Sequence, residues 1–365
     1  MIFHSLDFVV LFVVSLVVYW QLTLKWQNVL LLVVSYVFYG WVHPWFLFLI
    51  AATTIIDYSA ARGIERWPHR RKAFLWLSLV TNLGMLGFFK YFNFFVDNMA
   101  AVAATFGWTG SKPLLSIFLP VGISFYTFQS LSYTIDVYWR ETPARRSFLD
   151  VAAFVSFFPH LVAGPIMRAT NLLVQIEAER RFSVAAARDA TLLIVWGFFK
   201  KLVIADNVGI IANKVFALES PGFYTLWAGV FAFCIQIYAD FSAYTNIARG
   251  TAKWFGVDLI VNFRHPYLAT SPTDFWRRWN ISLSTWFRDY VYIPLGGSRH
   301  GHLRQARNVM ITFLLSGLWH GANWNYVIWG FYHGALLVVT RVVDLAWTPS
   351  PRTRRAAPRA SSPRA

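Results

Sequence analysis

Cysteine is almost absent from this chain, which has only Cys234 among its 365 residues. A single cysteine excludes an intrachain disulfide and any metal site built from several cysteine ligands. Acidic residues are also scarce, with 17 Asp and Glu, and charged residues make up only 14% of the chain. No polar linker separates the apolar blocks, so the sequence favours one continuous body over two soluble domains.

Apolar residues take the place of the missing charge. Hydrophobic residues make up 57% of the chain and aromatic residues 19%. Apolar stretches near the roughly 20 residues that cross a bilayer recur from end to end. This pattern predicts an all-α, polytopic integral membrane protein. The predicted helices lie at 6–19, 28–42, 45–61, 74–95, 114–139, 190–205, 222–247 and 324–345.

Basic residues outnumber acidic residues by 16, and they gather in short loops between the apolar stretches. This distribution indicates orientation in a membrane and argues against nucleic-acid binding. The loops at 62–72 and 140–146 are predicted to be cytoplasmic, while the 96–113 loop and the N-terminus are predicted to lie outside. Stretch 6–19 has no basic start and no small-residue cleavage site, so we expect a retained helix and not a signal peptide.

Two apolar segments are predicted to be interrupted. Segment 148–166 lies between two basic loops and contains Pro159 and Pro165, so it is expected to enter and leave the membrane on the cytoplasmic face. Such a re-entrant hairpin is tolerated only where other helices or a water-filled cavity cover the broken backbone. The second segment that is predicted to be interrupted is 309–323, which contains His320.

Residues 274–292 differ in kind from the apolar spans. Bulky apolar side chains recur there at spacings of three and four, which lines one face of a predicted amphipathic helix. The helix is expected to lie at the membrane interface or at a cavity mouth. Its arginines, Arg277, Arg278 and Arg288, are candidate ligands of lipid head groups.

His320 lies in the apolar, Trp-rich run GLWHGANWNYVIWG at 317–330. An ionisable side chain within a membrane segment is a functional-site hypothesis that requires a polar partner. Asn280 is the partner that we expect. The alternative is a histidine held in a structural role.

Other polar side chains carry weaker hypotheses. His300 and His302 flank Gly301 in a basic loop without a nearby carboxylate, so solvated loop histidines are favoured over a metal site. His160 and His333 are likewise weak candidates for a metal site. His160 could line a cavity, although a structural hydrogen bond is favoured. Within stretch 222–247, three polar residues could line a polar cavity or bond to neighbouring helices; they are Gln236, Tyr238 and Asp240.

Several long motifs resemble those of the membrane-bound O-acyltransferase family, in particular its bacterial alginate O-acetyltransferase branch. Two of them are DFWRRWNISLSTWFRDYVYIPLGGSR at 274–299 and RNVMITFLLSGLWHGANWNYVIWGFYHG at 307–334. The segments 119–140, 157–168 and 238–256 are also similar to that branch. The resemblance covers most of residues 1–340.

The resemblance implies a ring of roughly 8–11 transmembrane and re-entrant helices around a central tunnel in a bacterial inner membrane. It implies that His320 is the catalytic histidine and that Asn280 stands where most of the branch has a second histidine. The branch usually has an aspartate where this chain has Asn246, to which we assign no role.

Acyl transfer to a hydroxyl needs a base and a donor to the oxyanion, roles that His320 and Asn280 can fill. No Gly-x-Ser-x-Gly elbow occurs, so direct transfer is favoured over a covalent serine intermediate. The resemblance implies an acyl thioester as co-substrate, either acetyl-CoA or an acyl carrier, with no bound cofactor and no metal. Arg277, Arg278 and Arg288 could then bind the phosphates of this donor instead of lipid head groups.

The expected function is therefore transfer of an acyl group, expected to be acetyl, from a cytoplasmic thioester toward hydroxyls of an extracytoplasmic polysaccharide such as alginate. Expected partners are membrane lipids and either the polysaccharide or a periplasmic acetyl-relay protein. Two alternatives stay open. One is a catalytically impaired scaffold of a polysaccharide-modification complex, and the other is a secondary transporter or channel.

The domain prediction is a transmembrane acyltransferase domain at 1–347 and a disordered tail at 348–365. The tail is rich in Pro, Ala and Arg, with five arginines and no acid, so it cannot bury a core. Relatives in the family usually continue with further transmembrane helices beyond the catalytic histidine. The resemblance therefore implies a C-terminally shortened chain, in which loss of those helices could impair activity.

Overall fold

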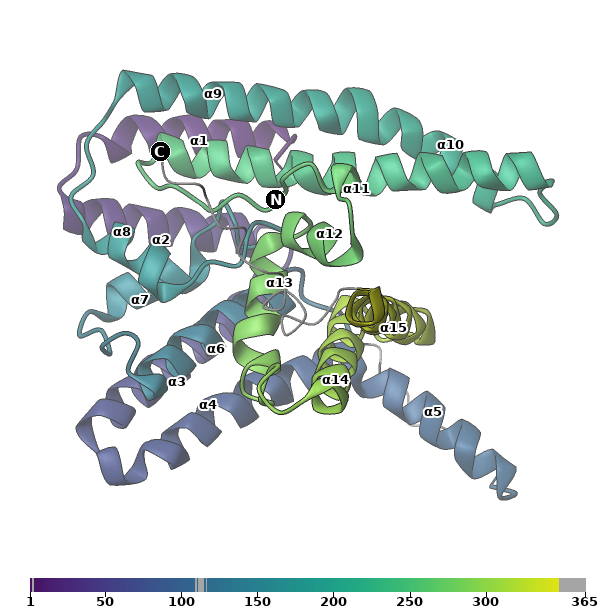
Figure 1. The fold of residues 1–365 in the computed structure, drawn as a ribbon. Coiled ribbons are helices and arrows are strands. Elements are labelled where there is room, and N and C mark those ends of the chain that lie inside the picture. The colour runs from purple at the N-terminus through teal and green to yellow at the C-terminus, as the bar shows by residue number, and fades with distance from the viewer. Residues whose placement is uncertain (2, 109, 111–114, 116, 348–365) are drawn as a thin grey trace, which may run out of the picture. The chain divides into compact units, whose positions relative to one another are not determined.

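The structure, a computed structural model, describes residues 1, 3–108, 110, 115 and 117–347 (Figure 1). All regular structure in these residues is helical. The α-helices are α1 Leu6–Tyr19, α2 Leu24–Gly40, α3 Phe46–Arg66, α4 Arg71–Leu86, α5 Phe92–Thr105, α6 Ile123–Trp139, α7 Phe148–Ser156, α8 Val174–Glu177, α9 Val184–Phe198, α10 Asp206–Phe216, α11 Phe223–Trp254, α12 Pro272–Arg278, α13 Ile281–Phe287, α14 His302–His320 and α15 Trp324–Trp347.

Short helical segments of other types join several of these helices. The π-helices are η2 Gly87–Tyr91, η3 Ala169–Leu173, η4 Phe199–Ala205 and η6 Arg288–Tyr292, and the 3-10 helices are η1 Pro68–Arg70 and η5 Pro266–Leu268. Because η4 joins α9 to α10 without a break, the predicted span 190–205 is the middle of a helical run from 184 to 216.

Four helical runs of the described chain are long and apolar enough to cross a membrane. They are Phe46–Arg66, Pro68–Thr105, Phe223–Trp254 and Trp324–Trp347. Three of them confirm the predicted helices at 45–61, 222–247 and 324–345. Helix α1 also begins and ends as predicted, but its 14 residues are shorter than a usual span.

Two predicted boundaries were wrong. The run that begins at Pro68 continues to Thr105, so much of the predicted 96–113 loop is helix, while residues 109 and 111–113 lie outside the described residues. Helix α6 begins only at Ile123, although the predicted stretch began at 114. Gly122 stops the helix there because its φ of 81° lies in the left-handed region.

The chain divides into two compact units. The first comprises Met1–Arg264 and Asn280–Leu283. The second comprises His265–Trp279 and Ser284–Ala365, of which the described part ends at Trp347. Asn280 belongs to the first unit and His320 to the second. The predicted tail at 348–365 lies outside the described residues.

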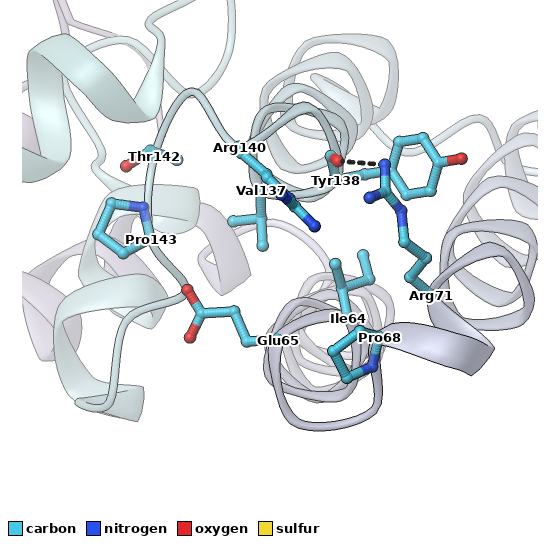
Figure 2. Close-up of a pocket in the computed structure, with 9 residues that line it drawn as sticks. All are labelled: Ile64, Glu65, Pro68, Arg71, Val137, Tyr138, Arg140, Thr142 and Pro143. Carbon is cyan, nitrogen blue, oxygen red and sulfur yellow. Dashed lines mark hydrogen bonds between the residues drawn. The ribbon is translucent and has the colours of Figure 1, made fainter.

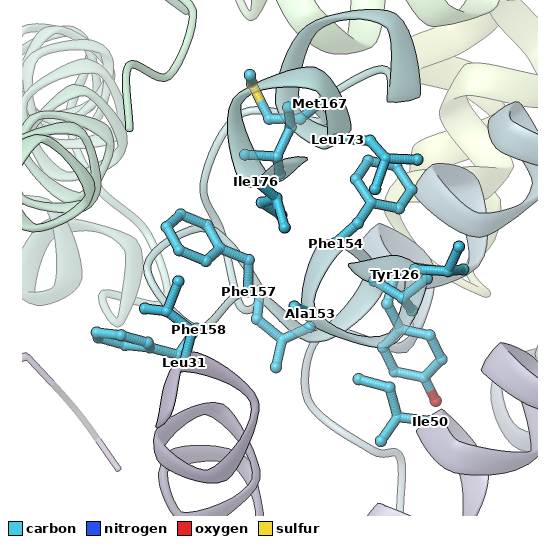
Figure 3. Packing of buried hydrophobic residues seen from close by; sticks show 14 of the residues in the cluster. Leu31, Ile50, Tyr126, Ala153, Phe154, Phe157, Phe158, Met167, Leu173 and Ile176 are labelled. Atoms are coloured by element: carbon cyan, nitrogen blue, oxygen red, sulfur yellow. The ribbon is translucent and has the colours of Figure 1, made fainter. Parts of the chain in front are cut away.

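The core of the first unit forms around the interrupted segment 148–166. Helix α7 ends at Ser156, and the chain then turns, with almost every residue from Val151 to Met167 buried. Figure 3 shows Phe154, Phe157 and Phe158 packed among side chains of neighbouring helices. A nine-residue helix is too short to cross a membrane, which agrees with the predicted interruption.

Hydrogen bonds from neighbouring segments satisfy the broken backbone. Gln129 of α6 donates to the carbonyl of Phe154 at 2.5 Å. The amide of Phe158 donates to the Ser35 hydroxyl at 3.0 Å, and the amide of Ile166 donates to the Ser282 hydroxyl at 3.0 Å. The interruption is therefore covered by protein, as a break at membrane depth requires.

The predicted single helix at 274–292 was wrong. The chain forms α12, α13 and η6 instead, with a break at Trp279 and Asn280. Asn280 has φ of 41°, a left-handed conformation that cannot continue a right-handed helix. The regular spacing of apolar residues passes across this break, which is why the pattern predicted one helix.

The predicted interruption within 309–323 is confirmed and lies at the C-terminal end of that segment. Helix α14 is continuous from His302 to His320, and the break follows at Gly321, whose backbone is extended. A Cβ added to Gly321 would overlap the Tyr326 ring. His320 is therefore the last residue of a regular helix and does not lie inside an irregular segment.

The re-entrant prediction for 148–166 can be tested by labelling. Arg145 bonds to Glu177 and Arg180 bonds to Asn28, so their exposed neighbours Arg146 and Arg181 are better positions for cysteines. In a Cys234→Ser background, we expect Arg146→Cys and Arg181→Cys to resist an impermeant thiol reagent added to intact cells, because short basic loops stay inside.

Phe106→Cys, at a highly exposed position in the predicted outer region, serves as the reactive control. All three cysteines should react after the cells are permeabilised. Labelling of only one of positions 146 and 181 in intact cells would show that segment 148–166 crosses the membrane.

Candidate active site

His320 is placed by a tightly packed hairpin of α14 and α15 in the second unit. A Cβ added to Gly317 would overlap the backbone carbonyl of Tyr326, and one added to Gly330 would overlap that of Phe313. The two helices therefore approach backbone to backbone, which only small residues permit. This close approach fixes the position of His320 against the first turns of α15.

An aromatic cluster surrounds the His320 imidazole. Its ring lies 4.9 Å from the Trp319 ring and 5.0 Å from the Trp329 ring, centroid to centroid, both close to perpendicular. The Tyr326 ring lies 6.4 Å away and nearly parallel. The site is thus a half-buried imidazole among large aromatic side chains.

A second imidazole lies on the same tryptophan. The His333 ring is 4.7 Å from the Trp329 ring and 5.2 Å from the Trp276 ring. Trp276 and Trp329 are themselves 5.7 Å apart at 82°. The structure therefore brings His320, Trp329, His333 and Trp276 together, although sequence analysis supported only a weak hypothesis for His333.

The surroundings of His320 suit a group that gains a proton. The C-terminal end of a helix carries a partial negative charge, which stabilises a cation there by about 0.3–1 kcal/mol. An imidazolium formed at His320 would therefore be stabilised by the C-terminal end of α14.

Asn280 occupies a buried break between α12 and α13, with 3% of its surface exposed. The residues after it are held by Asn262, which accepts from the Ile281 amide through its carbonyl at 2.9 Å and from the Ser282 amide through its side chain at 2.8 Å. Asn and His are both enriched at positive φ, so either can occupy position 280 without much strain. Because Asn280 and His320 belong to different units, their pairing stays a prediction.

The three candidate arginines separate into different environments. Arg278 donates to Asp274 at 2.9 Å, and this hydrogen bond lowers the pKa of the Asp274 carboxyl below its usual value. Arg288 donates to Asp289 at 2.7 Å. Arg277 instead lines a pocket with residues of α14 and α15. Only Arg277 of the three is thus directed to a pocket without a carboxylate bonded to it.

Comparison with known proteins identifies the family. The model of the MBOAT, membrane-bound O-acyltransferase, family matches residues 140–361, which include both Asn280 and His320. The chain belongs to this family. It is therefore a multi-pass membrane protein of an O-acyltransferase family.

Three curated relatives with different names illustrate the similarity. A probable alginate O-acetylase AlgI of Pseudomonas putida is 43% identical over 96% of this chain and 72% of the relative. A peptidoglycan O-acetyltransferase of Helicobacter pylori is 35% identical over 87% of this chain and 64% of the relative. A teichoic acid D-alanyltransferase of Streptococcus thermophilus is 28% identical over 63% of this chain and 58% of the relative.

His160 and Asp240 of this acyltransferase have structural surroundings. His160 is buried and bonds to Gln129 at 2.5 Å, which agrees with a structural hydrogen bond. Asp240 pairs with Lys201 at 2.9 Å, which joins α11 to η4 and fits the interhelical alternative. No group of three or more His, Cys, Asp or Glu side chains suited to a metal occurs among the described residues.

Sequence reasoning missed a buried polar cluster at Asp57 of α3. Its carboxylate accepts hydrogen bonds from Ser78 at 2.5 Å, from Asn82 at 2.9 and 3.0 Å, and from Ser130. These donors come from α4 and α6, so the cluster ties three helices together. The signal in the sequence was a lone acid inside the apolar stretch 45–61.

A pocket of about 390 Å³ opens near the ends of α3, α4 and α6 (Figure 2). The Arg71 guanidinium lies 4.2 Å from the centre of the Tyr138 ring and donates to the Tyr138 carbonyl at 3.1 Å. Glu65 accepts from the Ala144 amide at 2.6 Å. These bonds connect the ends of neighbouring helices around the pocket, and we assign the pocket no catalytic role.

Substitutions at position 280 can separate a backbone role from a chemical one. Asn280→Gly keeps the positive φ and removes the side-chain amide. If the amide stabilises an oxyanion, turnover of purified protein should fall by about 10²–10³ while the melting temperature stays close to wild type. Asn280→His should retain activity.

Asn280→Leu is the matched comparison, because it removes the amide and also strains the backbone. It should lose both turnover and thermal stability. Full activity in Asn280→Gly together with a damaged Asn280→Leu would assign position 280 a purely conformational role.

Proposed function

We propose that this protein transfers an acetyl group from a cytoplasmic thioester, acetyl-CoA or an acyl carrier, toward hydroxyls of an extracytoplasmic polysaccharide such as alginate. The 43% identity to a probable alginate O-acetylase over 96% of the chain supports the acceptor class. The observation that carries the proposal is His320, held at the end of α14 among aromatic rings within the family-matched segment.

The proposed chemistry is a direct transfer. An imidazole nitrogen of His320 accepts the proton of the acceptor hydroxyl while the oxygen attacks the thioester carbonyl carbon. The Asn280 amide donates to the oxyanion of the tetrahedral intermediate. The carbon–sulfur bond then breaks, and the imidazolium returns the proton to the leaving thiolate, so that one ester and one thiol result.

The aromatic cluster supports this role by excluding water. A reacting imidazole shielded by Trp319, Trp329 and Tyr326 favours an alcohol over hydrolysis of the thioester. We propose that His320 and Asn280 line a tunnel through a ring of helices in a bacterial inner membrane, with the N-terminus outside. A periplasmic relay protein would then complete delivery to the polymer.

His320→Ala tests the assignment against a matched neighbour, His333→Ala. Both imidazoles lie against Trp329, but only His320 ends α14. His320→Ala should lower acetyl transfer by on the order of 10²–10⁴, as loss of a general base does. His333→Ala should stay within about tenfold of wild type, because it removes packing only.

The measurement is thiol release from acetyl-CoA in the presence of an oligosaccharide acceptor, with protein reconstituted in lipid and its melting temperature recorded. Activity of His320→Ala within a few-fold of wild type would refute the assignment. Absence of transfer by the wild-type chain, with intact folding, would favour the scaffold alternative.

A further inference from the structure

A second pocket, of about 500 Å³, lies wholly within the second unit. It is enclosed by α12, the first turns of α14 and the last turns of α15. Its polar lining consists mainly of hydrogen-bond donors. These are Ser271, Thr273, Arg277, His302, Gln305 and Arg341.

Two of these donors are the guanidinium groups of Arg277 and Arg341, and Arg277 also lies close enough to Asp274 to help lower the pKa of that carboxyl. Arg277 and Arg341 form no salt bridge within the described part of the chain, whereas the neighbouring Arg278 and Arg288 each do. The pocket also contains one carboxylate among its lining residues, that of Asp344. Two positive charges beside hydroxyl and amide donors favour binding of an anion that accepts hydrogen bonds from both guanidinium groups.

The pocket lining also has an apolar part. It consists of Val309 of α14 and of Leu337, Val338, Val342 and Leu345 of α15. Helix α15 is long and apolar enough to span a membrane, and little of it is buried. A ligand that fits both the charged and the apolar lining carries an anionic group and an extended or apolar group.

The pocket is separate from the reacting imidazole. His302, at the pocket, and His320 are the two ends of α14. At about 1.5 Å per residue these ends are roughly 27 Å apart. An anion bound in the pocket therefore does not contact His320, and only a long arm attached to that anion could extend toward it.

We infer that this pocket binds a phosphate ester, with Arg277 and Arg341 clamping the phosphate oxygens and α15 covering the attached chain. Guanidinium groups match phosphate geometry through paired N–H donors. The phosphate can come from a membrane phospholipid or from a coenzyme A thioester. The second source would deepen the proposed function and rests on it, whereas the first is independent of acyl transfer.

Binding can be measured without turnover by using the full-length chain carrying His320→Ala. One arm reconstitutes the protein in phosphatidylcholine nanodiscs with or without phosphatidylglycerol and measures co-purified lipid by native mass spectrometry. The other arm titrates coenzyme A and inorganic phosphate by calorimetry. Retention of phospholipid that coenzyme A does not displace identifies lipid, and displacement by coenzyme A identifies the donor.

The test variant is Arg277→Gln with Arg341→Gln, and the matched control is Arg299→Gln with Arg304→Gln. The control removes the same charge from exposed arginines near the start of α14 that do not line the pocket. The test variant should weaken binding of the retained ligand by on the order of 10- to 100-fold, as loss of charge-assisted hydrogen bonds does. The control variant should change the affinity for the same ligand by less than about threefold.

Val338→Trp provides a second variant that keeps both arginines and fills the pocket. It should also abolish retention, which guards against a folding defect specific to the charge change. Equal binding by wild type, the arginine variant and Val338→Trp, or an equal loss in the matched control, would overturn the inference. Because every arm reads binding in an inactive background, failure of the proposed acetyl transfer leaves this result unaffected.

Discussion

The first unit depends on satisfying the backbone of a broken helix in an apolar interior. Each unpaired peptide group in hydrocarbon costs several kcal/mol, so a chain can turn at membrane depth only where side chains replace the lost helical bonds. Gln129, Ser35 and Ser282 do this for the segment after α7. Gln129 also holds His160, so one side chain of α6 fixes two parts of the turn.

The same constraint explains where the candidate catalytic groups lie. A functional side chain in a regular helix points sideways, whereas a helix end also offers unpaired carbonyls and a local field. His320 ends α14, and Asn280 occupies the break between α12 and α13. The chain tolerates the second break because Asn262 bonds to the two amides that follow it. The break at Asn280 is thus stabilised by a neighbouring side chain.

Sequence reasoning succeeded where the signal is local and failed where it is not. Long apolar runs predicted α3, α11 and α15 because length alone decides whether a helix can span. The single helix predicted at 274–292 was wrong because apolar spacing does not register the positive φ of one residue, Asn280. The partners of Asp57 could not be identified from sequence, because they come from two other helices, α4 and α6.

In the candidate site, too, local sequence signals were informative and contacts between distant residues were not predicted. Motif resemblance and an isolated imidazole in a Trp-rich segment predicted His320, and those signals lie within about a dozen residues. The arginines were grouped because they share one predicted helix face, but the structure pairs two of them with aspartates and directs the third to a pocket. Arg341 could not be associated with Arg277 from sequence, because only the packing of α12 against α15 brings them to one cavity.

The α14–α15 hairpin therefore has two different ends. Gly317 and Gly330 let the two helices pack backbone to backbone near His320. At the other end the helices and α12 leave about 500 Å³, lined by two arginines and one aspartate. The length of α14 separates these ends, so a molecule anchored in the pocket reaches His320 only if its arm spans most of α14. The helix thus sets a length requirement for any ligand that would contact both the pocket and His320.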